Sequence, residues 1–200
     1  MKMKLLISAA LAMTAIRGYA LNPIIQTIYT ADPAPVVHNG VCYLYVDHDE
    51  DGVGKDGFTL KDWRCFTSTD MVNWTDHGVV ATLHDFKWAG SGWGGGFENG
   101  AWALQCIERD GKWYMYCPLQ GRGIGVLVST NGPFGPFTDP IGKPLIGGNH
   151  DSIDPAVFID KDGQAYLCWG NAESLNSASH GAGRAMSRKS RQREVQLGKR

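Results

Sequence analysis

The chain has 200 residues, of which 43% are hydrophobic and 10% aromatic, enough for one packed domain or for part of a larger one. Its net charge of −1 conceals an uneven distribution. Residues 21–171 hold nine Lys or Arg against eighteen Asp or Glu, whereas residues 172–200 hold seven against two. An acidic main body lacks the positive surface that nucleic acids require, so we expect no nucleic-acid partner.

The first twenty residues have the pattern of a signal peptide. Lys2 and Lys4 precede an apolar stretch, Leu5 to Ile16, and Gly18-Tyr19-Ala20 has the small-x-small pattern of a cleavage site. We therefore predict a signal peptide over residues 1–20 and a secreted or periplasmic protein, with a buried first helix as the alternative. The apolar stretch is too short to span a bilayer, and no other segment is long and apolar enough, so we expect no membrane span.

Residues 21–171 have an all-β texture, without a sustained helical period. Three segments align on a turn glycine, and each carries a tyrosine three residues after it. Asn-Gly and Asp-Gly favour two-residue type I′ hairpins, because both central residues of that turn need a positive φ. The three turn dipeptides are Asn39-Gly40, Asp110-Gly111 and Asp162-Gly163.

A second element follows each of the first two hairpins. Ser68-Thr69 leads to Trp74-Thr75-Asp76, and Ser129-Thr130 leads to Phe137-Thr138-Asp139. A unit of four short strands that recurs at roughly 50 residues is typical of a β-propeller blade, whereas a β-sandwich would not repeat this order of elements. We therefore predict an all-β propeller over residues 21–171, of which about two and a half blades are present.

The last segment, residues 172–200, differs from the rest. It contains no aromatic residue and carries the basic run from Arg188 to Arg193. A basic tail that binds polyanions is one interpretation. We favour a non-native, disordered end to the chain, because the change of texture falls in the middle of a blade.

The five cysteines are odd in number, so at least one is unpaired. A two-residue turn at Asp110-Gly111 places Cys106 and Cys117 diagonally rather than opposite each other, which disfavours a disulfide between them. Their spacings match no zinc-binding pattern. We expect these thiols to act as small buried hydrophobic groups.

Two aspartates stand at equivalent places in this repeat. Asp32-Pro33-Ala34 precedes the first hairpin, and Asp154-Pro155-Ala156 precedes the third. The following proline predicts extended backbone at each aspartate. Because the first strands of propeller blades line the central axis, the two carboxylates are expected to converge there, an arrangement that suits glycoside hydrolysis. The alternative is a pair of ordinary aspartates at strand starts.

Several of these segments resemble glycoside hydrolase family 43. The resemblance rests on Asp32-Pro33-Ala34-Pro35, Ser68 to Trp74, Trp102 to Gln105, Asp154 to Asp160 and Asp162 to Leu167, in the right order. It implies a five-bladed β-propeller that acts by inversion on arabinose- and xylose-containing plant polysaccharides.

The same resemblance implies roles for three carboxyl groups. Asp32 matches the general base that activates water, and Asp154 matches the second aspartate, which orients and tunes the acid. The family's glutamate general acid has no counterpart here, since the only acids after Asp162 are Glu173 and Glu194. Inverting hydrolysis needs that acid, so we expect this chain to be inactive as it stands.

Two tryptophans are candidate substrate-binding residues. Trp102 opens the second hairpin, where the family places an aromatic residue near the sugar, and a core tryptophan is the equally weighted alternative. Trp93, with Trp88, belongs to a glycine-rich loop over residues 87–96 that is long enough to reach over a cleft, either as a binding loop or as a lid.

No cofactor is assigned from the sequence. The run Asp47 to Gly52 begins like a calcium-binding loop, but Phe58 stands where the twelfth position needs a glutamate, so an exposed loop is expected. Family members can hold a calcium ion on the propeller axis. His150 lies near the right strand, but it is not assigned.

Two other functions compete with this interpretation. A related five-bladed group hydrolyses fructans, but it carries Asn-Asp-Pro-Asn, whereas Asp32 here is flanked by Ala31 and Pro33-Ala34. A non-catalytic carbohydrate-binding propeller would keep the aromatic residues and tolerate loss of the carboxylates.

Overall fold

Two four-stranded antiparallel sheets and one hairpin make up the part of the chain that the computed structural model describes, residues 24–51, 57–90, 96–148 and 152–170. Each four-stranded sheet is a meander whose strands pair in chain order. The first sheet contains β1 (Tyr29–His38), β2 (Val41–Asp49), β3 (Leu60–Ser68) and β4 (Thr75–Thr82). The second contains β5 (Gln105–Arg109), β6 (Lys112–Leu119), β7 (Gly123–Ser129) and β8 (Ile146–Gly147). The hairpin is β9 (Ala156–Ile159) with β10 (Ala165–Cys168).

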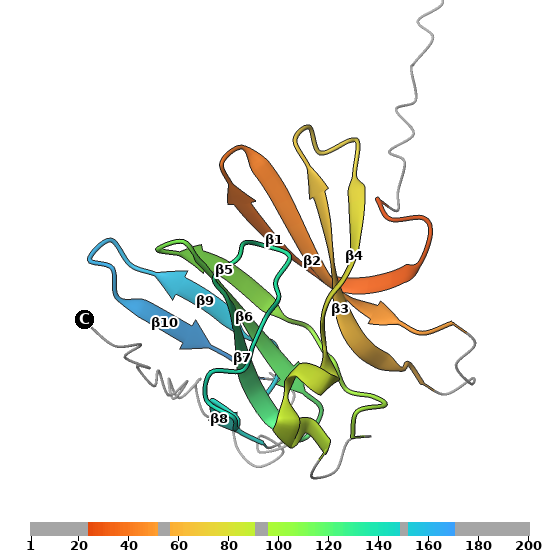
Figure 1. The fold of residues 1–200 in the computed structure, drawn as a ribbon, viewed down its shortest axis with the longest axis vertical. Helices are drawn as coiled ribbons and strands as arrows, with labels where there is room; N and C mark the ends of the chain where they lie inside the picture. The colour runs from red at the N-terminus through yellow and green to blue at the C-terminus, as the bar shows by residue number, and fades with distance from the viewer. Residues whose placement is uncertain (1–23, 52–56, 91–95, 149–151, 171–200) are drawn as a thin grey trace, which may run out of the picture.

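The first strands of the three units lie next to one another. β1 contacts β5, and β5 contacts β9, while the outer strands fan away from this line (Figure 1). Two short 3₁₀ helices, Leu83–Asp85 and Lys87–Gly90, connect the first sheet to the second. This arrangement confirms the predicted partial propeller, with two blades and the start of a third. In the described residues no helix is long and apolar enough to cross a membrane.

All three predicted hairpins form, but the predicted type I′ turn is confirmed in two of them and wrong in the third. Asn39 and Asp110 have φ values of 50° and 55°, and each is followed by a glycine with positive φ, as a type I′ turn requires. In the third hairpin the Gly163 amide donates to the Asp160 carbonyl at 2.8 Å, and only Gly163 has positive φ. This is a type I turn followed by a left-handed glycine, a three-residue loop that Asp162-Gly163 alone does not reveal.

The fourth strand of the second blade lies elsewhere than predicted. Thr138 forms only an isolated bridge with Val128, and the fourth strand is instead β8, which pairs Ile146 with Ile124. Pro136 and Pro140 flank the predicted strand and have no amide hydrogen to donate to a ladder, so the pairing does not extend.

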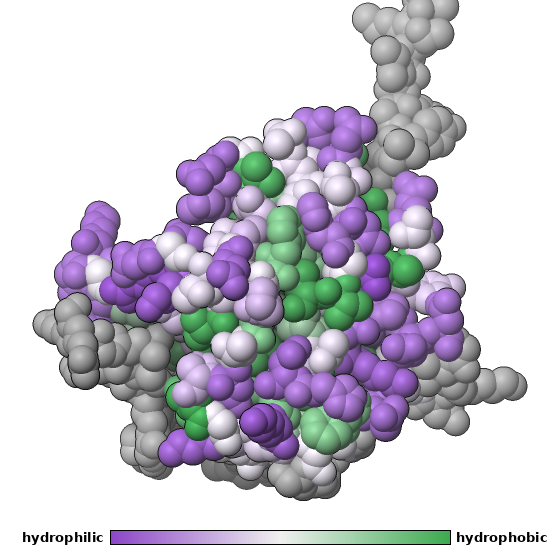
Figure 2. All heavy atoms as spheres, viewed as in Figure 1, coloured by the Kyte–Doolittle hydropathy of each residue, from purple (hydrophilic) through white to green (hydrophobic). Residues whose placement is uncertain are grey.

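The main core lies between the first two blades. Residues of β2 alternate between the two faces of the sheet. Tyr45 is fully buried toward the second blade, where its hydroxyl donates to the Pro133 carbonyl at 2.7 Å. Leu44 and Val46 belong to a separate cluster on the opposite face, with Phe66. Figure 2 shows hydrophobic residues in the middle of this view, with hydrophilic residues around them.

All five cysteines are unpaired in the structure. Four of them are buried and one, Cys168, is exposed. Cys106 pairs with Met115 and Cys117 with Gly125 across the ladders, so the predicted offset between these two thiols is confirmed. The expected role as small buried hydrophobic groups therefore holds for all but Cys168.

Hydrogen bonds tie each blade to the next. The indole Nε1 of Trp63 in β3 donates to the Trp102 carbonyl at 2.8 Å. Arg109 at the end of β5 donates from Nη2 to the Gly163 carbonyl at 2.9 Å. These bonds fix the position of each blade relative to the next.

Candidate active site

Asp32 lies on a β-bulge near the start of the first strand. In the β1–β2 register Ala31 faces Asp47 and Ala34 faces Tyr45, so two residues, Asp32 and Pro33, face a single residue of β2. Asp32 has a φ of 48°, so the predicted extended backbone at this residue is wrong. The extra residue of a bulge takes such a conformation and turns its side chain away from the regular pleat.

Asp154 repeats this conformation in the third unit. It lies two residues before β9 and has a φ of 51°, again directly before a proline, so the extended backbone predicted there is also wrong. Both aspartates are exposed. Partial burial raises the pKa of Asp154 above its ordinary value, and the negative charge of Asp32 raises it further. The two predicted carboxylates therefore lie near enough for the charge of Asp32 to act on Asp154.

Asp47 is a third carboxyl group at this site, and the sequence interpretation missed it. The run from Asp47 was expected to form an exposed loop, but Asp47 lies in β2 and only 1% of its surface is exposed. Its Oδ1 accepts a hydrogen bond from the backbone amide of Ala31, in the bulge, at 3.1 Å. That bond fixes the bulge that carries Asp32.

Burial and Asp32 change the ionisation of Asp47. Burial raises the pKa of Asp47 most, and the charge of Asp32 and a hydrogen bond to that residue raise it further, to about 7. The bond from the Ala31 amide acts in the opposite direction. The sequence does contain a signal for the burial of Asp47. Side chains alternate along β2, so Asp47 points to the same face of the sheet as Tyr43 and Tyr45.

Trp102 lies just before the second blade. It precedes β5 by three residues in an irregular segment instead of opening the strand as predicted, because its amide donates to the Pro118 carbonyl at 3.2 Å, outside the ladder. The half-buried indole packs against the main core, and its buried Nε1 has no hydrogen-bond partner among the described residues. The side chain thus combines a core contact with a free donor, and both interpretations of Trp102 remain open.

The glycine-rich segment is described only in part. Trp93 and His150 lie outside the described residues, as do residues 1–20 and 172–200 with their predicted signal peptide and tail. Trp88, which was considered with Trp93, packs against the main core, and its Nε1 donates to Asp139 Oδ2 at 2.9 Å, so it anchors the 3₁₀ segment. The buried Arg122 guanidinium donates to the carbonyls of Ala89, Gly96 and Asn99.

Taken together, fold and site define a class of protein. It is a β-propeller whose first strands present neighbouring aspartates at the axis, held by left-handed backbone and by a buried third carboxyl group. Comparison with known sequences gives the family. The chain belongs to glycosyl hydrolases family 43, whose model matches residues 20–197.

Curated relatives carry related names. An arabinoxylan arabinofuranohydrolase of Bacillus subtilis (strain 168) is 37% identical over 170 residues, which cover 73% of this chain and 32% of that protein. A xylosidase/arabinosidase of Humicola insolens is 38% identical, covering 75% and 46%, and one of Bacteroides ovatus is 39% identical, covering 71% and 43%. The chain therefore spans less than half the length of these relatives.

Solved structures agree with the fold. A family 43 enzyme from Xanthomonas citri, complexed with xylose, is 32% identical with a TM-score of 0.62, covering 75% of this chain and 42% of that one. An α-L-arabinofuranosidase from Clostridium thermocellum is 38% identical with a TM-score of 0.57, covering 74% and 50%.

Proposed function

We propose that the whole protein to which this chain corresponds is a glycoside hydrolase that cleaves arabinofuranosyl or xylosyl linkages of plant polysaccharides with inversion. One observation carries the proposal. Asp32 and Asp154, from separate blades, adopt the same left-handed backbone and lie close enough for one charge to shift the pKa of the other. Bringing like charges together costs free energy, and such arrangements cluster at catalytic sites.

In this proposal Asp32 is the general base. It is exposed to the axis, where a water molecule can reach it, and the bulge fixes its direction. The carboxylate takes a proton from water as the oxygen attacks the anomeric carbon on the face opposite the leaving group. Loss of such a base typically lowers the rate by about 10²–10⁴-fold.

Asp47 positions this group, whereas Asp154 matches the family's second aspartate, which orients and tunes the general acid. A protonated Asp47 donates a hydrogen bond to Asp32, and its Oδ1 accepts one from the Ala31 amide. Together these bonds keep the base oriented. Asp154 places a second negative charge beside the reaction centre, where positive charge develops on the sugar ring in the transition state. Trp102 is half-buried, and the exposed part of its ring offers an aromatic face for the sugar.

The general acid is not assigned to this chain. The described glutamates have other surroundings: Glu98 pairs with Lys61 at 3.3 Å, Glu108 pairs with His38 at 3.4 Å, and Glu50 lies beside His48 and Asp62. We therefore propose that residues 1–200 alone bind sugar weakly and do not turn it over.

A chimaera tests the proposal. Residues 24–170 of this chain would be joined to the part of the Bacteroides ovatus xylosidase/arabinosidase that lies C-terminal to its matching region. We expect hydrolysis of 4-nitrophenyl arabinofuranoside or xyloside, product of inverted configuration by proton NMR, and a 10²–10⁴-fold lower kcat after Asp32→Asn. Asp110→Asn, in an exposed turn, is the matched control. An active chimaera that is indifferent to Asp32→Asn would contradict the assignment.

A carbohydrate-binding propeller without catalysis is the competing function. It is favoured by the half-buried Trp102 ring. It predicts that Asp32→Asn leaves xylo-oligosaccharide affinity unchanged and that no variant of the folded chimaera hydrolyses any substrate. The hydrolysis assay separates the two functions, and calorimetric titration of the same variants shows whether sugar binding survives Asp32→Asn.

A further inference from the structure

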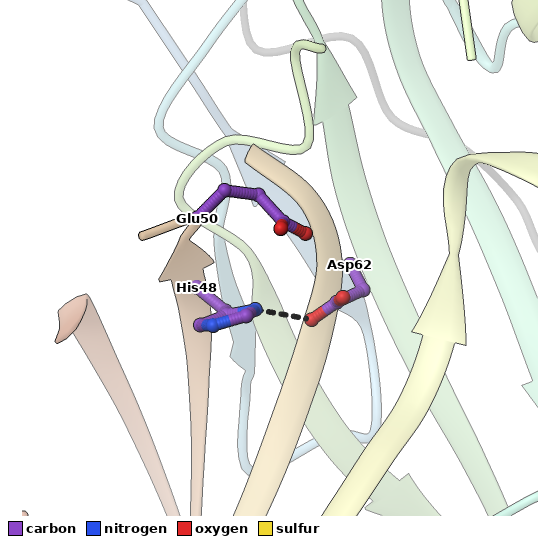
Figure 3. A group of neighbouring side chains, drawn as sticks. All are labelled: His48, Glu50 and Asp62. Carbon is purple, nitrogen blue, oxygen red and sulfur yellow. Dashed lines mark hydrogen bonds and ion pairs between the residues drawn. The ribbon is translucent and has the colours of Figure 1, made fainter. Parts of the chain in front are cut away.

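A second polar cluster lies on the first blade and contains none of the three carboxyl groups described above. It contains His48 of β2, Glu50 just after that strand and Asp62 of β3 (Figure 3). His48 Nδ1 lies 3.1 Å from Asp62 Oδ1, and one ligand atom from each of the three residues lies within 4.8 Å of the others. Because successive strand residues point to opposite faces, His48 projects from the face opposite to the buried Asp47.

A β-bulge directs Asp62 toward His48. Asp47 faces Trp63 and Asp49 faces Leu60 in the β2–β3 register, so two residues of β3, one of them Asp62, lie opposite His48. Bulges of this kind redirect a side chain and are frequent at functional sites. The side chains of His48 and Asp62 keep only 16% and 14% of their surface exposed, which limits competition from water.

The backbone also fixes the third member of the cluster. The Glu50 amide donates to the Thr59 carbonyl at 2.9 Å, so the end of β2 is held to the start of β3. Figure 3 shows the carboxylate of Glu50 on the same side as the His48–Asp62 pair. In the part of the chain that the structure describes, no cation pairs with Glu50, and neighbouring Lys61 and Arg64 bind Glu98 and Asp76.

The carboxylates of Glu50 and Asp62 lie beside one imidazole in this cluster. Mutual repulsion makes this arrangement unfavourable unless a cation lies between the groups. One imidazole nitrogen with two carboxylate oxygens suits a borderline divalent ion such as Zn²⁺, whereas Ca²⁺ prefers six to eight oxygen ligands. Zinc ligands lie about 2.0–2.2 Å from the metal, so the ligand atoms around one ion lie closer to one another than 4.8 Å. A rotation of the Glu50 side chain would bring its carboxylate oxygen nearer to His48 and Asp62.

We propose that His48, Glu50 and Asp62 bind one divalent transition-metal ion, of the Zn²⁺ type, with water in the fourth position. The ion joins the ends of β2 and β3 at the base of the connection between them. Its role is structural: it holds the outer end of the first blade. The site is independent of the proposed glycosidase activity, because it uses none of the axial carboxylates.

Calorimetric titration of the complete 200-residue chain with Zn²⁺, after treatment with EDTA, tests the site. We expect one ion per chain, an affinity lowered at least tenfold by His48→Ala, Glu50→Gln or Asp62→Asn, and a higher thermal midpoint with Zn²⁺ only while the site is intact. Glu50→Gln is the decisive variant, because Glu50 lies outside both strands and its loss leaves the His48–Asp62 bond in place.

His84→Ala is the matched control, since this exposed histidine belongs to no cluster of potential ligands among the described residues. Equal loss of affinity in His84→Ala and His48→Ala would show adventitious histidine binding and overturn the proposal. Absence of Zn²⁺ binding, or unchanged affinity in Glu50→Gln, would overturn it as well. Titration with Ca²⁺ in place of Zn²⁺ is expected to give no saturable binding that depends on His48.

Discussion

Asp32 and Asp154 share one backbone conformation, with φ values of 48° and 51°, although 122 positions separate them in the chain. Only five non-glycine residues of the described part have positive φ, and two of the other three, Asn39 and Asp110, serve hairpin turns. At the two aspartates no hairpin requires the conformation. Sparsely populated backbone of this kind is retained where it positions a functional side chain.

Substitution of Asp32 separates backbone strain from charge. Asparagine tolerates the left-handed region through local hydrogen bonds, whereas a Cβ without such bonds costs about 1–2 kcal/mol there. We therefore expect Asp32→Ala to unfold about 1–2 kcal/mol more easily in urea than Asp32→Asn, although both remove the charge. Asp32→Gly should behave like Asp32→Asn. Equal stability of the alanine and asparagine variants would show that residue 32 is not left-handed in solution.

The raised pKa of Asp154 predicts a pH-dependent gain on its removal. A folded pKa above the unfolded value, about 3.9, means that ionisation lowers the free energy of unfolding as pH rises through the folded pKa. Asp154→Asn should thus be more stable than the unsubstituted chain at pH 7, and the difference should disappear near pH 3. Urea unfolding at both pH values measures it. Asp110→Asn is the control, and a larger gain at pH 3 than at pH 7 would refute the sign.

Thiol reactivity should follow burial. Cys65, Cys106 and Cys117 are fully buried, and burial raises the pKa of each thiol, so little thiolate is available. Cys168 is exposed in the terminal strand β10. We expect one fast-reacting thiol per native chain with Ellman's reagent, none in Cys168→Ser, and all five after denaturation. Two or more fast thiols in the native chain would show that the core between the blades opens readily.

The repeat in the sequence predicts much of the fold and part of the site. Asn39-Gly40 and the Asp-Pro pairs are local signals, because a turn or a strand start depends on a few neighbouring residues. Asp47 gives only the weaker signal of alternation along β2, because its burial and its contact with Asp32 depend on the packing of β1, β2 and the second blade. The type of the third turn could not be predicted from Asp162-Gly163, because this dipeptide occurs both in a type I′ turn and in a three-residue loop.

Gly125 is where the second blade meets the connection from the first most closely. A Cβ on this residue of β7 would lie 2.3 Å from Phe86 Cε1 and 2.9 Å from Trp88 Cζ2. Neither ring moves easily, because Phe86 is fully buried against Trp63 and the Trp88 indole is held by Asp139. We expect Gly125→Ala to lower the free energy of unfolding by about 1–3 kcal/mol through overpacking.

Gly147 provides the matched control for this prediction. It lies in β8 of the same sheet, without positive φ, and a Cβ there meets no atom of the described residues within 4 Å. Gly147→Ala should therefore leave the urea midpoint unchanged or raise it slightly, because alanine restricts the unfolded chain. If the two variants unfold at the same urea concentration with equal m-values, the rings of Phe86 and Trp88 do not pack on β7. The hydrogen bonds of Trp63 and Arg109 would then hold the blades together instead.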